Sequence, residues 1–232
     1  MAEPVINKEN KLREDLRKVK TLMDGGDPDL LEFIRGRDDH RIHLRSKRST
    51  DISEMGEDEF KDFFGKEHMW AGLIDFAGVD TIIRHNSFER TRDHFASIYR
   101  FVEDNEVINI DSWERLSDLD KFGNAWLTEI LALLNDNYVI LNSSSVWTAK
   151  RYGFVLKSNN AEKYIGLCST FKRISDIMGE MGFKDHTPYD ADGVLKYIQE
   201  LENPKNGRSS RSKTANKNTE FEKTDSVHSF AR

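Results

Sequence analysis

A single cysteine, Cys168, is present among 232 residues, so the chain cannot form an internal disulfide. It also lacks any apolar run approaching the roughly 18 residues that a membrane-spanning helix needs, and residues 1–10 have no apolar core of the signal-peptide kind. A lone cysteine is typical of a reducing compartment. We therefore expect a cytoplasmic protein that neither inserts in nor crosses a membrane.

Positive charge is also in short supply. The chain has 35 lysines and arginines against 41 acidic residues, a formal net charge of −6, which excludes a protein that is basic all over. Nucleic-acid binding would therefore have to come from local clusters. Residues 35–48 form one such cluster, which includes Arg41, Arg45 and Arg48. These arginines could contact phosphates, or they could serve only to keep the surface soluble.

Apolar residues become scarce near the C-terminus. Residues 203–232 are rich in Ser, Asn, Thr and Lys, and their basic residues outnumber the acidic ones. Such a segment cannot bury enough apolar surface to offset the entropy that ordering costs. We expect a disordered basic tail there, an N-terminal amphipathic helix within residues 1–26, and one domain over residues 27–202.

What the chain does have is helical periodicity. No stretch alternates apolar and polar residues convincingly as a half-buried strand would, whereas apolar residues recur every three or four positions. The predicted fold class is therefore all-α, a helical bundle. Helices are predicted over residues 8–23, 28–34, 58–64, 88–103, from 111 onward, 124–134, 143–151, 161–181 and 191–201.

Several helix starts carry local capping signals. The Asp-Pro pair at residues 27–28 is an N-cap followed by proline at the first helical position. Ser87 can cap the helix that follows it, and Asp111 with Glu114 resembles a capping box. Asn142 precedes another predicted helix and would make a good N-cap.

The segment at residues 8–23 has a narrow apolar stripe formed by Leu12, Leu16, Val19 and Met23. Such a stripe could dock a partner protein or a second copy of the chain. It supports an alternative function, that of a protein-interaction or structural helical module without DNA binding, which could form an oligomer through its N-terminal helix.

Residues 116–142 hold the clearest functional pattern. A short segment with helical spacing meets Gly123 and continues into the most apolar helix candidate of the chain. A glycine lets the backbone approach closely, and a helix N-terminus attracts an anion. We therefore take Lys121, Gly123, Asn124 and Arg151 as candidate nucleic-acid contacts, against the alternative of an ordinary turn between two packed helices.

Lys121-Phe122-Gly123 and the helix after it resemble the helix-hairpin-helix of the DNA glycosylase superfamily. There, a Gly-apolar-Gly hairpin leads into a helix whose N-terminal N–H groups hold a DNA phosphate. Lys121 stands at the first glycine of that pattern, and Trp126 stands where a small residue is usual. The resemblance therefore implies a degenerate helix-hairpin-helix.

A wider likeness spans residues 57–201. The chain is similar to a glycosylase-like helical domain at the N-terminus of McrB-type restriction NTPases and related defence proteins. The shared motifs are Asp-Glu-Phe-Lys-Asp-Phe-Phe at 58–64, Trp70, Gly-Asn-Ala-Trp-Leu-Thr-Glu-Ile-Leu at 123–131 and Tyr-Val-Ile-Leu-Asn-Ser-Ser at 138–144. A phosphate-binding Gly-x-x-x-x-Gly-Lys-Ser/Thr loop is absent. The resemblance thus implies a DNA recognition part of a restriction or phage-defence system, working with a separate NTPase or nuclease subunit.

Two departures from the glycosylase pattern bear on activity. The resemblance places a catalytic aspartate at the position of Asn142 and, in bifunctional members, a lysine at the position of Ala125. An amide cannot stabilise the developing cation of base excision as a carboxylate can. We therefore expect no enzyme activity, no catalytic residue and no cofactor. The leading hypothesis is a non-catalytic DNA recognition module.

Two other candidate sites have plainer interpretations. Asp51, Glu59 and Lys61 superficially match a metal-dependent nuclease, but that chemistry needs rigidly placed carboxylates and the segment is predicted as helix and loop. His40 and His43 suggest a metal, yet no Cys/His pair at zinc spacing accompanies them. A solvated polar loop is favoured there, and we expect no metal site.

Overall fold

The computed structural model describes residues 5–65, 67–69 and 78–202, with side chains from residue 8 onward. Every regular element within these ranges is a helix, as the sequence predicts. None of the described helices is long and apolar enough to cross a membrane. Trp70 and the tail predicted at residues 203–232 lie outside the described residues.

Most described helices follow the predicted segments within a few residues. α3 and α5 were not predicted, because their six and eight residues are too few for a period of 3.6 to stand out. The helices of the described ranges are α1 Val5–Asp24, α2 Pro28–Arg45, α3 Ser49–Glu54, α4 Glu57–Phe63, α5 Val79–Asn86, α6 Phe88–Glu103, α7 Ile110–Ser117, α8 Gly123–Leu134, α9 Ser143–Arg151, α10 Asn160–Glu180 and α11 Pro188–Glu202.

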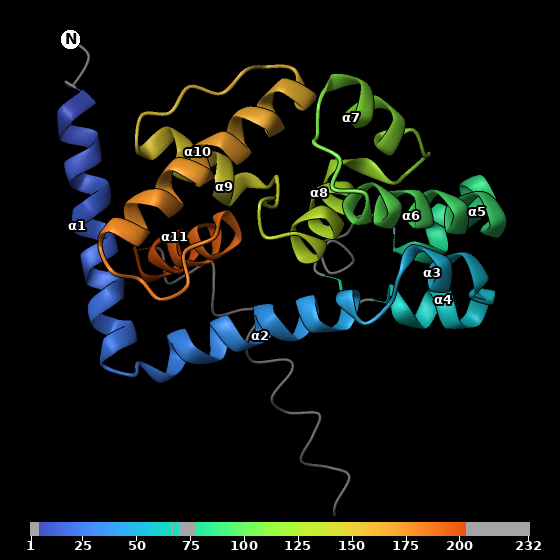
Figure 1. Cartoon of the computed structure of the whole chain (residues 1–232), viewed down its shortest axis with the longest axis horizontal. Helices are drawn as coiled ribbons and strands as arrows, with labels where there is room; N and C mark the ends of the chain where they lie inside the picture. The colour runs from blue at the N-terminus through green and yellow to red at the C-terminus, as the bar shows by residue number, and fades with distance from the viewer. Residues whose placement is uncertain (1–4, 66, 70–77, 203–232) are drawn as a thin grey trace, which may run out of the picture.

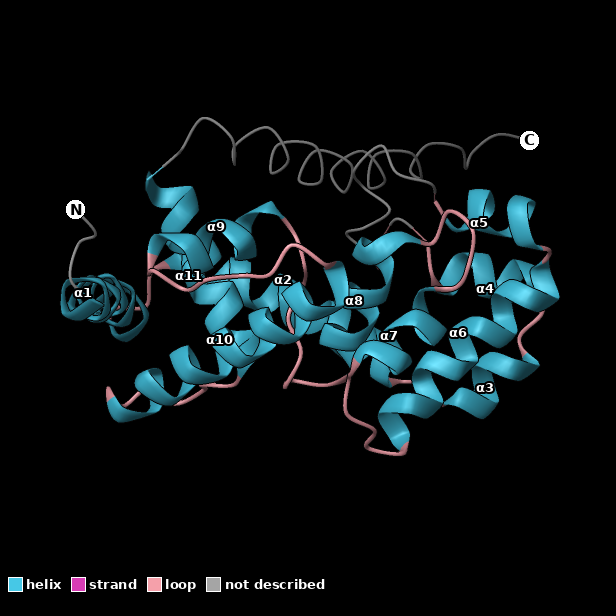
Figure 2. Cartoon of the chain, turned by 90° about the horizontal axis from the view of Figure 1, so that it is seen from above, coloured by secondary structure: helices cyan, strands magenta, loops and turns pink. Residues whose placement is uncertain are grey.

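The helices form two groups that α2 and α8 join. In Figure 1, α1, α9, α10 and α11 lie at one end of the molecule and α3 to α6 lie at the other, while α2 runs below the first group and α8 and ends where α3 begins. Figure 2 shows the same division from above. α8 contacts α2, α6 and α7, so the turn that leads into it lies near the middle of the molecule.

One apolar core runs through both groups, and α1 belongs to it. Leu12, Leu16 and Val19 are at most 1% exposed, and α1 contacts both α11 and α2. The prediction that this stripe docks a partner or a second copy is therefore wrong, because the chain covers the stripe itself. Burial of three such side chains also gives α1 a direct part in stability.

α2 is longer than the sequence predicts. It continues to Arg45 rather than ending at residue 34, so the predicted polar loop around His40 is wrong. Tertiary contacts explain the extension. Arg45 Nε donates to Leu133 O at 2.8 Å, and His40 Nδ1 lies 2.7 Å from His68 O. These partners lie well away in the sequence, so the local pattern of residues could not reveal them.

Local capping signals place three helix starts correctly. Asp27, Ser87 and Asn142 each accept a hydrogen bond from a backbone N–H of the helix that they precede. The box predicted at Asp111 is wrong, because α7 begins one residue earlier and Asn109 is its N-cap. Asn142 in particular has the capping role that the sequence favours for it.

Candidate nucleic-acid interface

The turn between α7 and α8 has an unusual backbone. Lys121 has φ 63° and Gly123 has φ 62°, so both lie in the left-handed region, and Phe122 between them is right-handed. Glycine adopts this conformation freely, whereas another residue does so at a cost of about 1–2 kcal/mol. Lys121 thus adopts a glycine-like backbone at the position where the pattern it resembles has a glycine.

Asn86, the last residue of α5, holds this turn in place. Its side-chain nitrogen donates to Asp120 O at 2.8 Å, and its side-chain oxygen accepts from Asp120 N at 3.1 Å. Phe122 fills the inner side of the turn, where it is 1% exposed and its ring centroid lies 5.1 Å from that of Phe95. Buried hydrogen bonds and aromatic packing therefore hold the turn in one conformation.

The outer side of the turn faces solvent. Lys121, Gly123 and Ala125 are exposed, and a Cβ added at Gly123 would meet nothing within 4 Å. Trp126, whose bulk would hinder a close contact, is instead 2% exposed and packs against the core. α8 begins without a side-chain cap from its N-cap residue and has no acidic residue in its first turn. Its first N–H groups therefore face outward for an anion.

A second cation, Arg90, lies on α6, the helix whose Phe95 packs against Phe122 of the turn. His94, one helical turn after Arg90 on α6, has its Nε2 2.9 Å from Leu116 O, and its ring centroid lies 5.2 Å from that of Phe122. Burial lowers the pKa of His94, and the charge of Arg90 lowers it further, which marks Arg90 as a near neighbour. Arg90 is exposed and forms no ion pair with a described residue. The sequence analysis missed it because its place depends on contacts between distant segments.

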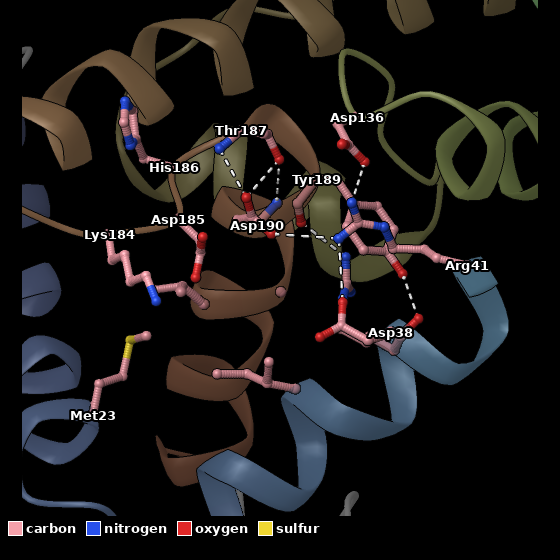
Figure 3. A pocket seen from close by; sticks show the side chains of 14 residues that line it. Met23, Asp38, Arg41, Asp136, Lys184, Asp185, His186, Thr187, Tyr189 and Asp190 are labelled. Atoms are coloured by element: carbon pink, nitrogen blue, oxygen red, sulfur yellow. Dashed lines mark hydrogen bonds and ion pairs between the residues drawn. The ribbon is translucent and has the colours of Figure 1, made fainter. Parts of the chain in front are cut away.

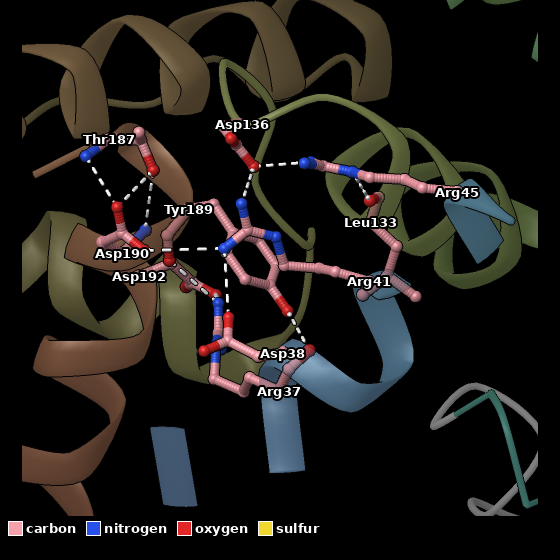
Figure 4. A network of polar contacts seen from close by, with 10 residues as sticks. All are labelled: Arg37, Asp38, Arg41, Arg45, Leu133, Asp136, Thr187, Tyr189, Asp190 and Asp192. Carbon is pink, nitrogen blue, oxygen red and sulfur yellow. Dashed lines mark hydrogen bonds and ion pairs between the residues drawn. The ribbon is translucent and has the colours of Figure 1, made fainter. Parts of the chain in front are cut away.

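Two arginines of the predicted basic cluster at residues 35–48 form ion pairs within the molecule (Figure 4). Arg41 Nη2 and Arg45 Nη2 both lie 2.6 Å from Asp136 Oδ1, in the connection between α8 and α9. Arg41 also pairs with Asp38 at 3.2 Å and with Asp190 at 3.9 Å, so these shared ion pairs tie α2 to that connection and to α11. Arg41 and Arg45 remain predicted phosphate contacts, but their ion pairs with Asp136 leave them less available than the sequence suggests. Arg48 stays exposed just before α3.

Arg151 also forms ion pairs within the molecule. Its guanidinium lies 3.0 Å from Asp15 Oδ2 and 2.5 Å from Glu202 Oε2, and its side chain is 14% exposed. Its guanidinium carbon also lies 4.9 Å from the Trp147 ring centroid. These contacts join α1, α9 and α11, and they make Arg151 less available to a phosphate than the sequence suggests.

A cavity of about 450 Å³ opens between α2, α11 and the connection from α10 to α11 (Figure 3). The guanidinium carbons of Arg37 and Arg41 lie 4.0 and 4.9 Å from the Tyr189 ring centroid on its wall. Arg37 is 4% exposed and donates to Tyr189 O at 2.9 Å and to Asp192 Oδ2 at 3.4 Å. These arginines hold α2 against α11, so the cavity wall is built for packing and we assign it no ligand.

The residues of the nuclease alternative lie on two short helices. Asp51 is in α3, while Glu59 and Lys61 are in α4. Glu59 pairs with Lys47 at 3.2 Å, and Lys61 pairs with Glu57 at 2.6 Å. Within the described ranges, no group of three or more His, Cys, Asp or Glu side chains could hold a metal ion. The nuclease alternative therefore has no support in the geometry.

Arg48 stays exposed, but the α7–α8 turn is the candidate interface that the geometry favours. It contains Lys121, Gly123 and Asn124 of the predicted contacts, with Arg90 on the adjoining helix α6, while Arg41, Arg45 and Arg151 serve internal ion pairs. Neither a protein family model, nor a curated protein, nor a solved structure matches this chain.

Proposed function

We propose that this chain is a non-catalytic nucleic-acid recognition module that contacts a DNA phosphate at the α7–α8 turn. The observation that carries the proposal is the backbone of that turn, which is left-handed at Lys121 and Gly123, held by Asn86 and open to solvent. A phosphate there would accept hydrogen bonds from the first N–H groups of α8 and face the Lys121 ammonium. Such contacts position a nucleic-acid backbone and carry no sequence information.

The charges around the turn set the expected strength of binding. Lys121 and Arg90 favour a phosphate, whereas Asp118 and Asp120 are also exposed and oppose it. With opposing charges so close, the fixed N–H groups of α8 supply much of the attraction. We therefore expect weak binding at low salt, with a salt dependence of about one to two phosphate contacts, or a slope of roughly −1 to −2 in log K against log salt.

The proposal assigns no reaction to the chain. Asn142 is committed to capping α9, where it accepts a hydrogen bond from Ser145 N at 2.9 Å, and its amide is neutral. Ala125 supplies no amine beside the turn. In a restriction or phage-defence system of the kind that the chain resembles, a separate NTPase or nuclease subunit would act on the bound DNA.

The experiment is a fluorescence anisotropy titration of labelled duplex and single-stranded DNA at two salt concentrations. Lys121→Glu should weaken binding at low salt at least tenfold for every sequence tried, because it replaces an attraction with a repulsion. Lys157→Glu is the matched control, since Lys157 is exposed between α9 and α10. Asp118→Asn should strengthen binding, because it removes an opposing charge.

Two results of the titration would contradict the proposal. The proposal fails if the wild-type chain binds neither form of DNA at low salt. It also fails if Lys121→Glu and Lys157→Glu weaken binding equally, because the attraction would then come from overall charge rather than from the turn.

A further inference from the structure

His68, from the segment after α4, meets His40 and His43 on one side of α2. The rings of His43 and His68 are stacked, with centroids 3.7 Å apart and planes 10° apart. The ring of Phe63, at the end of α4, lies 4.3 Å from that of His43. His40, one helical turn before His43, reaches the backbone of His68. The cluster thus joins α2 to α4 and to residues 67–69.

Hydrogen bonds assign the protons of two of these rings. His40 Nδ1 lies 2.7 Å from His68 O, and His43 Nε2 lies 2.9 Å from Phe63 O. A carbonyl oxygen only accepts, so each of these nitrogens carries a proton and donates. The neutral form of each ring is therefore enough to make its contact, and a second proton adds no bond to these carbonyl groups.

A second proton would place positive charge inside a stack of imidazoles. Among the described residues, the charged groups that face the rings are Asp39 on α2, which faces His40, and Asp62 on α4, which faces His43. Both carboxylates favour protonation. Burial opposes it more strongly and lowers the pKa of His40 and His43, and the neighbouring His68 adds to the effect.

We propose that His40, His43 and His68 form an acid-sensitive latch that holds residues 67–69 on α2 while the rings are neutral and releases them when protons add positive charge to the stack. Like charges 3.7 Å apart repel, and a partly buried site screens them weakly. The latch needs no metal and is independent of phosphate binding at the α7–α8 turn.

Two backbone amides report on the latch. His68 N and Met69 N both donate to Gly65 O, at 3.0 and 3.2 Å, so their hydrogen exchange measures the opening of this segment. In the full chain, we expect their protection to fall at least tenfold between pH 7 and pH 5, after correction for intrinsic exchange. His68→Gln keeps the backbone acceptor for His40 but removes the second imidazole, and it should abolish this fall.

His85→Gln is the matched control, because His85 is exposed on α5 and belongs to no described ring pair; it should keep the wild-type fall. NMR titration of the His43 ring gives a second measurement in the same variants. The pH midpoint of the His43 titration should move upward in His68→Gln, because the neighbouring imidazole no longer opposes a positive charge on His43. Wild-type protection that stays constant from pH 7 to pH 5 would overturn the proposal. The proposal would also be overturned if amide protection fell as much in His68→Gln as in the wild type and the pH midpoint of the His43 titration did not move.

Discussion

At the scale of single residues, the contact of Arg37 with Gly193 shows how closely α2 and α11 approach. A Cβ added at Gly193 would lie 2.9 Å from Arg37 Nε and 3.1 Å from Arg37 Cζ. Arg37 cannot move aside at low cost, because it is buried and donates to Tyr189 O and Asp192. A glycine in the middle of α11 is thus explained by packing rather than by backbone conformation.

We expect Gly193→Ala to destabilise the protein by about 1–3 kcal/mol, as overpacking of a filled site does. Gly36→Ala on α2 is the control, because a Cβ there would meet nothing within 4 Å. Alanine in an open helical site should stabilise by about 0.5–1 kcal/mol. Urea denaturation of both variants measures the difference. If the two variants were equally stable, the Arg37 side chain would be able to move aside at little cost.

At the scale of helices, α1 and α2 show what local pattern can and cannot indicate. The stripe of α1 predicts a helix correctly, since its apolar residues recur at helical spacing, but the pattern alone does not say what covers it. α2 presents the opposite case. Its residues 35–45 have little amphipathic pattern, yet they are helical because Arg41, Arg45 and His40 find partners in distant segments.

Leu16→Ala tests the docking of α1. Leu16 is fully buried, so its truncation should lower the free energy of unfolding by about 2–5 kcal/mol. Leu31→Ala on α2 is the control, because Leu31 is 43% exposed and a surface change usually stays within about 0.5 kcal/mol. Thermal or urea denaturation of the isolated chain checks both. An unchanged stability of Leu16→Ala would mean that α1 packs on something other than this chain.

At the scale of the whole molecule, titration of partly buried histidines links stability to pH. Burial lowers the pKa of His40, His43 and His94, so the unfolded chain binds protons more readily than the folded one. Their contribution to stability is complete above the ordinary histidine pKa of about 6.5. It is lost as the pH falls from there through the lowered values of the folded state.

The free energy of unfolding should therefore decrease between pH 7.5 and pH 5.5, by up to about 1.4 kcal/mol per pH unit for each extra proton that the unfolded chain binds. Urea denaturation across this range measures it, well above the ordinary titration of carboxylates near pH 4. His94→Gln should flatten the dependence, whereas His186→Gln, at an exposed position, should leave it unchanged. Stability that is constant or rises toward pH 5.5 would contradict the assignment.

The sequence by itself determined the all-helical class and many of the helix boundaries. These depend on neighbours three or four residues apart, so the caps at Asp27, Ser87 and Asn142 could be identified from local chemistry. Short helices such as α3 escaped notice, because they span too few positions to show a period.

Only the tertiary structure decided which charges remain available at the surface. Arg41, Arg45 and Arg151 look like free cations in the sequence, but each has an acidic partner at least 51 residues away. In the same way, Asn86 and Phe122 hold Lys121 in a left-handed conformation that lysine does not favour alone. Charge neutralisation and backbone strain both depend on distant groups brought together by folding. For this reason the candidate interface is smaller than the sequence alone predicts. It consists of the turn at residues 121–123, with Arg90 on the adjoining helix α6.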